Sequence, residues 1–179
     1  EDEARFHPVT YNYYQQLNGY QYLKNLVIGY KFYQGNYLDA VSEVLDTTKK
    51  TIIHIPSVNS RAATGLGKHT EVDEIMQKIG TVRYTDYNTT IKYVVTPDGR
   101  ELKIANLVEE TTSERETLQR YLRNIKKKED VDIIIALGTA KEGFDWKWCE
   151  HCLTIGVRGS LTEIVQIIGR CTRDCEGKE

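Results

Sequence analysis

The sequence predicts an α/β fold in which helices cover both faces of a mainly parallel sheet. Compact apolar runs, rich in β-branched residues, alternate along the chain with amphipathic helical segments. Three of these runs, at 51–57, 131–137 and 151–157, are apolar almost throughout, which is typical of strands buried on both faces. With 179 residues, the chain is long enough for one domain with a sizeable core.

The composition is that of a soluble globular protein, with 40% apolar and 28% charged residues. A net charge of −2 argues against a wholly basic coat for nucleic acid, but it leaves room for a local basic strip. No apolar run approaches about 18 residues, so we expect no membrane span. The acidic start shows no secretory signal, so we expect a cytoplasmic protein with reduced thiols.

Residues 1–48 form a predicted lead-in segment, an inter-domain connection, ahead of a main domain at 49–179. The segment is rich in Tyr, Gln and Asn at first. An apolar stretch at 26–33 is interpreted as a strand. A short helix at 36–46 has apolar residues on one face, namely Leu38, Val41 and Leu45. The only methionine is Met76, and we expect the chain to be part of a longer polypeptide.

The main domain opens with the strand at 51–57, followed by an amphipathic helix at 70–80 that Gly80 closes. Turn residues at 97–100 then separate two β stretches, and the sequence assigns no role to this excursion at 91–108.

A strong helix is predicted at 112–128, where Ser113 and Glu116 form a capping box. The strands at 131–137 and 151–157 follow, and a last helix spans 161–170.

Two stretches near the carboxyl end carry residues suited to chemistry. "GTAKEGFDW" (138–146) follows a predicted strand, and "QIIGRCTRD" (166–174) closes the last helix. In parallel sheets the working groups lie beyond the carboxyl ends of the strands. Arg170 and Arg173 are three residues apart, so a helical turn points both the same way. A guanidinium is permanently charged and offers forked donors to phosphate.

In this order and on these elements, the two stretches resemble motifs V and VI of superfamily 2 helicases and translocases. "TIIHIPS" (51–57) stands where that family keeps motif IV, and the resemblance covers residues 50–175. It implies a three-layer RecA-like domain, the second (helicase C-terminal) domain of a two-domain motor. The amino-acid sequence of residues 140–174 resembles that of bacterial DEAD/DEAH-type helicases related to the motors of restriction enzymes. This resemblance favours DNA over RNA as the partner.

The resemblance also implies roles for particular residues. ATP with Mg²⁺ would be bound mainly by a first RecA-like domain, and this chain would supply three catalytic residues, namely Gln166, Arg170 and Arg173. The residues expected to face the nucleotide are Gly143, Asp145 and Gly169. Those expected to contact the nucleic-acid backbone are Ser57, Asn59, Arg61, Thr139 and Lys141.

Each of these roles has a plainer alternative. The two arginines could form a solvated helix face. Asp145 could cap a turn. The residues at 57–61 could be ordinary loop residues. For Gln166 the functional role itself has two forms, since this residue could orient a water molecule or bridge to the other domain.

The stretch "ATGLGKHT" (63–70) imitates a phosphate-binding P-loop, whose pattern is G-x-x-x-x-G-K-[ST]. Ala62 stands where the first glycine belongs, and His69 replaces the hydroxyl that would bind Mg²⁺. This mismatch favours a flexible Gly-rich connection.

The four cysteines lie at 149, 152, 171 and 175, a spacing that loosely imitates a zinc site. Because the first pair enters a predicted buried strand and Cys171 lies inside the arginine stretch, we favour thiol packing and assign no metal. Three functions follow in order of preference: a helicase motor domain, a non-enzymatic nucleic-acid-binding module, and a zinc-dependent interaction module.

Overall fold

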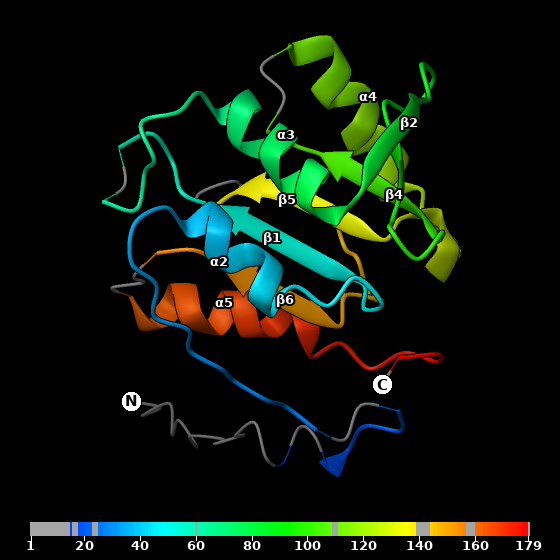
Figure 1. Ribbon diagram of the computed structural model, residues 1–179. Coiled ribbons are helices and arrows are strands. Elements are labelled where there is room, and N and C mark those ends of the chain that lie inside the picture. Colours follow the sequence, from blue (N-terminus) through cyan, green and yellow to red (C-terminus); the bar gives the residue numbers. More distant parts are fainter. Residues whose placement is uncertain are drawn as a thin grey trace, which may run out of the picture.

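The fold is a six-stranded sheet of strand order β2-β3-β4-β5-β1-β6 with helices on both faces (Figure 1). The computed structural model describes residues 15, 18–22, 25–59, 61–108, 111–138, 144–156 and 160–178. The strands are β1 (Thr51–Ile55), β2 (Thr81–Thr85), β3 (Lys92–Val95), β4 (Glu101–Asn106), β5 (Ile133–Leu137) and β6 (His151–Thr154). The helices are α2 (Tyr37–Val44), α3 (Lys68–Ile79), α4 (Thr112–Arg123) and α5 (Leu161–Cys171), with a 3₁₀ turn η1 at Lys128–Asp130.

The centre of the sheet is parallel, which confirms the predicted fold class. Strand β1 pairs in parallel with β5 on one side and with β6 on the other, so that Ile53 lies between Ile135 and Leu153. All five residues of β1 are buried, as expected for a strand covered on both faces. Membership of the RecA-like fold stays a prediction.

The predicted β-excursion belongs to the main sheet. Strand β4 pairs in parallel with β5, and β3 is antiparallel to β4. The sequence missed β2, an edge strand antiparallel to β3. Residues 81–84 of β2 are exposed, so β2 lacks the apolar run that revealed the central strands.

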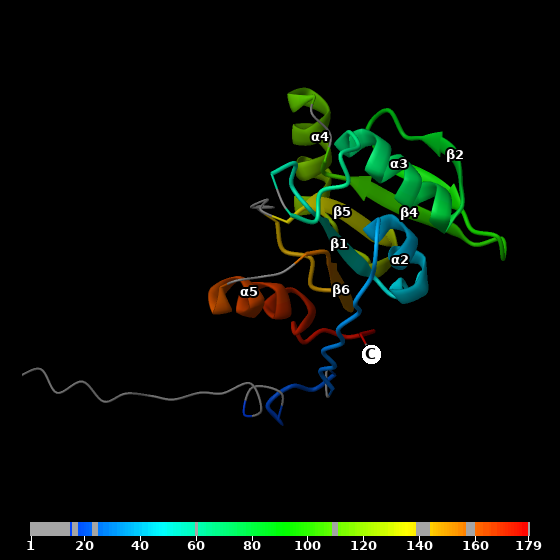
Figure 2. The ribbon, with the colours of Figure 1, turned by 60° about the vertical axis from the view of Figure 1, so that its left-hand side comes forward.

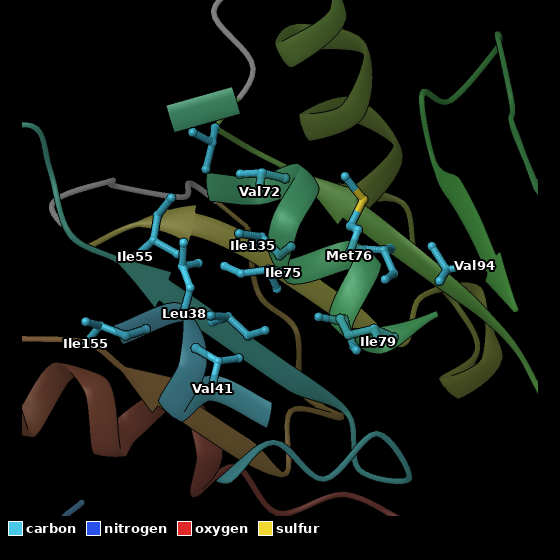
Figure 3. Close-up of a cluster of buried hydrophobic side chains, with 14 of the residues drawn as sticks. Leu38, Val41, Ile55, Val72, Ile75, Met76, Ile79, Val94, Ile135 and Ile155 are labelled. Carbon is cyan, nitrogen blue, oxygen red and sulfur yellow. The ribbon is translucent and has the colours of Figure 1, made fainter. Parts of the chain in front are cut away.

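Two apolar layers enclose the sheet. Helices α2 and α3 pack on one face, where Leu38, Val41, Ile75 and Met76 meet Ile135 of β5 (Figure 3). The other face carries α4 and the end of α5, which pack there through Leu118, Leu122 and Cys171. Figure 2 shows α3 and α5 on opposite sides of the sheet. Burial of each large aliphatic side chain contributes about 1.5–3 kcal/mol.

Two sequence predictions are wrong in detail. Residues 26–33 form no strand, and the side chains of Val27, Tyr30 and Phe32 are 89%, 84% and 94% exposed. The stretch has strand-like composition, but no described strand of the sheet pairs with it.

Helix α4 begins two residues earlier than the expected capping box requires, with Thr111 at the N-cap and no side-chain cap. Its end at Arg123 also precedes the expected end at residue 128. The carboxylate of Asp130 accepts the backbone N–H groups of Lys126 and Lys127, both at 3.0 Å. Such a local carboxylate bond offers the backbone an alternative to the helix, which accounts for the early stop.

Among the residues that the structure describes, no helix has both the length and the apolar character needed to cross a membrane.

Gly80 ends α3 at a point where the backbone of β3 approaches closely. Its N–H donates to the carbonyl oxygen of Met76 at 2.9 Å, and a Cβ at this position would lie 2.1 Å from the carbonyl oxygen of Val95. Only a residue without a side chain fits here, because the obstacle is backbone that cannot rotate away.

We therefore expect Gly80→Ala to lower the free energy of unfolding by about 2 kcal/mol, a typical cost of overpacking. Urea unfolding of the 179-residue chain followed by circular dichroism measures the change. Gly29→Ala is the control, because a Cβ on Gly29 meets nothing within 4 Å. Equal stability of both variants would contradict the close approach.

Candidate functional site

A cavity of about 290 Å³ lies between α5 and the segment that precedes β6. Five residues singled out from the sequence share its lining, namely Asp145, Gln166, Gly169, Arg170 and Arg173. The lining that the sequence did not indicate is apolar: Ile52, Phe144 and Trp146. The volume is at the lower limit for pockets that enclose a whole small molecule, so the cavity suits one wall of a larger site.

The cavity lies on a face of the sheet and not beyond the carboxyl ends of the strands, where we expected the working groups. Helix α5 starts after the end of β6 and runs back along the sheet, so that its last residue, Cys171, meets Cys149 just before β6 begins. Ile52, the second residue of β1, forms part of the cavity wall. The return of α5 therefore carries the arginines to the opposite end of the strands.

An ion pair joins the two sequence stretches that define the site. The guanidinium of Arg173 donates through Nη1 to Oδ2 of Asp145 at 2.8 Å. Both side chains are more than half exposed, at 54% and 58%, so water screens the pair and it contributes at most about 1 kcal/mol. A guanidinium carries five N–H donors, and this bond engages one of its nitrogens. The pair orients Arg173 without locking it.

Helix α5 makes few packing contacts with the rest of the domain. None of its 11 residues is buried, although its apolar residues gather on one face. Leu161 is 76% exposed, and Ile164 and Val165 are 37% and 44% exposed. The helix is therefore anchored mainly at its carboxyl end, where Cys171 packs against the core.

Three thiols gather behind the arginines. Sγ of Cys149 lies 3.7 Å from Sγ of Cys171, and Sγ of Cys152 lies 3.7 Å from Nδ1 of His54. Contact with Cys171 and burial raise the pKa of the Cys152 thiol, and contact with Cys149 together with burial raises the pKa of Cys171. The thiols of Cys152 and Cys171 therefore stay protonated at neutral pH. All three thiols pack as small apolar side chains.

The fourth cysteine, Cys175, donates to the carbonyl oxygen of Lys147 at 3.3 Å. Within the described part of the chain, which includes all four cysteines, no group of three or more His, Cys, Asp or Glu residues is arranged to hold a metal ion.

A buried lysine near the end of the chain supports the arginine turn, and the sequence did not reveal it. Nζ of Lys178 donates to the carbonyl oxygens of Arg173 at 2.9 Å and Lys147 at 3.3 Å. The residue is 5% exposed, and burial lowers its pKa, while nearby thiols and Glu150 oppose the shift. A lysine in a charged tail gives no sequence signal of burial, because its partners are distant carbonyl groups.

The residues expected to contact nucleic acid lie elsewhere. Ser57 is half-buried, and Asn59 and Arg61 are exposed, all three in the loop after β1. Thr139, Lys141 and Gly143 lie outside the described residues. Because β1 and β5 are adjacent and parallel, the loops that follow them leave the same edge of the sheet. The cavity lining includes none of the three described residues.

Lys68, the lysine of the stretch that imitates a P-loop, forms an ion pair inside the domain. Nζ of Lys68 donates to Oε2 of Glu71 at 2.7 Å, and the hydroxyl of Tyr37 donates to the same carboxylate at 2.9 Å. Burial alone would raise the pKa of Glu71, but hydrogen bonds from Lys68, Thr64 and Tyr37 outweigh it and hold the pKa below its usual value. Lys68 thus neutralises a buried carboxylate within α3, and the hydrogen bond from Tyr37 to that carboxylate joins α2 to α3.

The fold and the cavity define an α/β protein with an arginine-lined pocket beside a mainly parallel sheet. Over 179 residues, the chain is 60% identical to the protein named "Putative ATP-dependent helicase YeeB" of Bacillus subtilis (strain 168). The match covers 99% of this chain and 30% of the length of that homologue. No family model and no solved structure matches the chain.

The thiol contacts lead to a test of their packing role. In the native chain at pH 7.5, we expect Cys152 and Cys171 to react with a thiol reagent at least about tenfold more slowly than after unfolding in urea, because burial and a raised pKa suppress the thiolate. Mass spectrometry of alkylated peptides gives the rate for each cysteine. Stoichiometric zinc in the purified protein, found by metal analysis, would contradict thiol packing.

Proposed function

We propose that the chain is the second motor domain of an ATP-dependent helicase or translocase of superfamily 2. It would supply arginines to an ATP site that a first RecA-like domain completes. The observation that carries this proposal is the gathering of Asp145, Gln166, Gly169, Arg170 and Arg173 around one cavity, although the two stretches are distant in sequence. The helicase name of the homologue supports it.

Arginine chemistry explains the choice of residues. Phosphoryl transfer spreads negative charge over the γ-phosphate oxygens, and catalysis consists largely of placing positive charge there in advance. Arg170 and Arg173 offer permanent charge and forked donors at the cavity wall. Gln166, one helical turn before Arg170, is placed to orient the attacking water or to contact the first domain.

The cavity favours phosphate over a metal ion. Within the described part of the chain, Asp145 is the carboxylate that lines the cavity, and it is already paired with Arg173. Two guanidinium groups beside one paired carboxylate suit an anion and repel Mg²⁺. We therefore assign the residues that hold Mg²⁺ to the first domain, and the residues of this chain to the phosphate oxygens.

The loops after β1 and β5 would hold the nucleic-acid backbone. Ser57, Asn59 and Arg61 supply a hydroxyl, an amide and a guanidinium, which are the groups that commonly contact phosphate. Thr139 and Lys141 would join them from the neighbouring loop. DNA is the favoured partner, by resemblance to restriction-enzyme motors. Nucleic acid and ATP would then occupy different ends of the strands.

The proposal predicts that Arg170→Lys in the full-length protein lowers the ATPase rate by on the order of a hundredfold, because an ammonium cannot reproduce the forked contact. Arg115→Lys on the exposed start of α4 is the matched control and should change nothing. Steady-state phosphate release measures both. A non-enzymatic binding module would show no loss in the Arg170 variant, and rapid ATP turnover by the isolated 179-residue chain would contradict a shared site.

Gly169 allows stability and function to be separated. A Cβ at this position meets nothing within 4 Å, and the residue lines the cavity. Gly169→Ala should raise the free energy of unfolding by about 0.5–1 kcal/mol, because alanine favours the helix. The added methyl group should nevertheless weaken ATP hydrolysis, since it occupies space that the ligand needs. Urea unfolding and phosphate release test the two effects, and a variant with unaltered hydrolysis would exclude close approach of the ligand at Gly169.

A further inference from the structure

The carboxylate of Asp174 holds a distant part of the chain. The backbone N–H of Gln21 donates to its Oδ2 at 2.6 Å, and the backbone N–H of Tyr22 donates to its Oδ1 at 2.8 Å. The partners are 153 and 152 positions apart in sequence. Each oxygen thus receives one amide from consecutive residues. Hydrogen bonds to an ionised carboxylate are roughly twice as strong as neutral ones, and two of them fix its orientation.

Asp174 directly follows Arg173, so the contact acts on the backbone that carries the arginine. From inside the domain, Lys178 donates to the carbonyl oxygen of Arg173 at 2.9 Å. From outside, Gln21 and Tyr22 hold the next residue through its side chain. Hydrogen bonds from Lys178 on one side and from residues 21 and 22 on the other therefore fix the backbone of the turn after α5. The ion pair with Asp145 affects only the direction of the Arg173 guanidinium.

The segment on the other side of this contact leads to the start of the chain. From residue 25 to α2 the described residues form no helix or strand, and most are exposed. In Figure 2 this segment leaves α2 and passes beside the carboxyl end of α5. A segment with so few buried side chains is held only weakly by packing, so its two hydrogen bonds to Asp174 are a direct link to the arginine turn.

We propose that Asp174 is a positioning residue, which couples the amino-terminal segment to Arg173 through the backbone amides of Gln21 and Tyr22. The inference rests on the proposed function, in which Arg173 stabilises charge at the γ-phosphate. With the contact made, the arginine turn is fixed for catalysis. With the contact broken, the turn is held from inside alone, and the guanidinium samples more positions. Because the arginine acts in the transition state, the loss falls on kcat and not on KM.

The test uses the full-length protein and two variants that break the contact from opposite sides. Asp174→Ala removes both acceptors. Tyr22→Pro removes one donor, because proline has no N–H, and it leaves the arginine turn and its charge intact. Glu163→Gln on α5 is the matched control for loss of an exposed carboxylate. Hydrogen exchange of peptides containing residues 21 and 22 reports the contact, and phosphate release gives kcat and KM.

For Asp174→Ala we expect exchange at these amides to rise by about tenfold and kcat to fall by about tenfold, with KM for ATP within about twofold of the original. Tyr22→Pro should lower kcat in the same direction, and Glu163→Gln should change neither quantity. Asp174→Asn keeps an oxygen acceptor without the charge. Its exchange rate and its kcat should therefore lie between those of the wild type and those of Asp174→Ala.

Three results would overturn the inference. Unchanged exchange in Asp174→Ala would show that the contact does not exist in solution. Faster exchange with unchanged kcat in both variants would leave the contact but refute its positioning role. A full-length wild-type protein without ATPase activity would refute the proposed function, and the positioning role with it, while the exchange measurement would still report on the contact.

Discussion

The parallel pairing of β1 with both β5 and β6 is the constraint on which the other features depend. It fixes Ile53 between Ile135 and Leu153 at the centre of the sheet. Because the strands share one direction, the loops after β1 and β5 must leave the same edge, and α5 must return along the sheet before the chain can continue. The register thereby separates two surfaces: the edge where the loop after β1 carries the exposed residues Asn59 and Arg61, and the arginine-lined cavity near the opposite end. Under the proposed function, the first surface would hold nucleic acid and the second would hold the nucleotide.

Around the cavity, buried side chains hold the end of α5 in place, while a charged pair orients Arg173. The thiols of Cys149 and Cys171, in contact at 3.7 Å, anchor the end of α5 by packing, while hydrogen bonds from Lys178 fix the backbone of the turn. The ion pair between Arg173 and Asp145 is exposed and therefore weak enough to exchange for a phosphate. A rigid base under a loosely paired guanidinium is a suitable arrangement for an arginine that must bind a charged ligand and release it.

The elements that depend on local sequence pattern could be predicted from the sequence. The features that depend on contacts with residues far away in the sequence could not. The central strands and α5 were evident from apolar runs and helical spacing, and the residues around the cavity were identified from two short stretches. The strand expected at 26–33 has the right composition but no pairing partner, and α4 stops early because Asp130 binds the next amides. Lys178 and Asp174 gave no signal, because their contacts cross from Lys147 and from residues 21 and 22.

The size of the cavity and the exposure of α5 have one explanation under the proposed function. The cavity has a volume of about 290 Å³, and its described lining supplies two arginines and one paired carboxylate. These groups can bind phosphate oxygens, but the described lining is too small to enclose a nucleotide. Helix α5 presents Leu161, Ile164 and Val165 to solvent on the element that carries the arginines. An apolar surface beside half of a site is expected where a second domain closes over both, since closure would bury the surface and complete the site in one movement. Anchoring α5 mainly at its carboxyl end then leaves its outer face available to that domain.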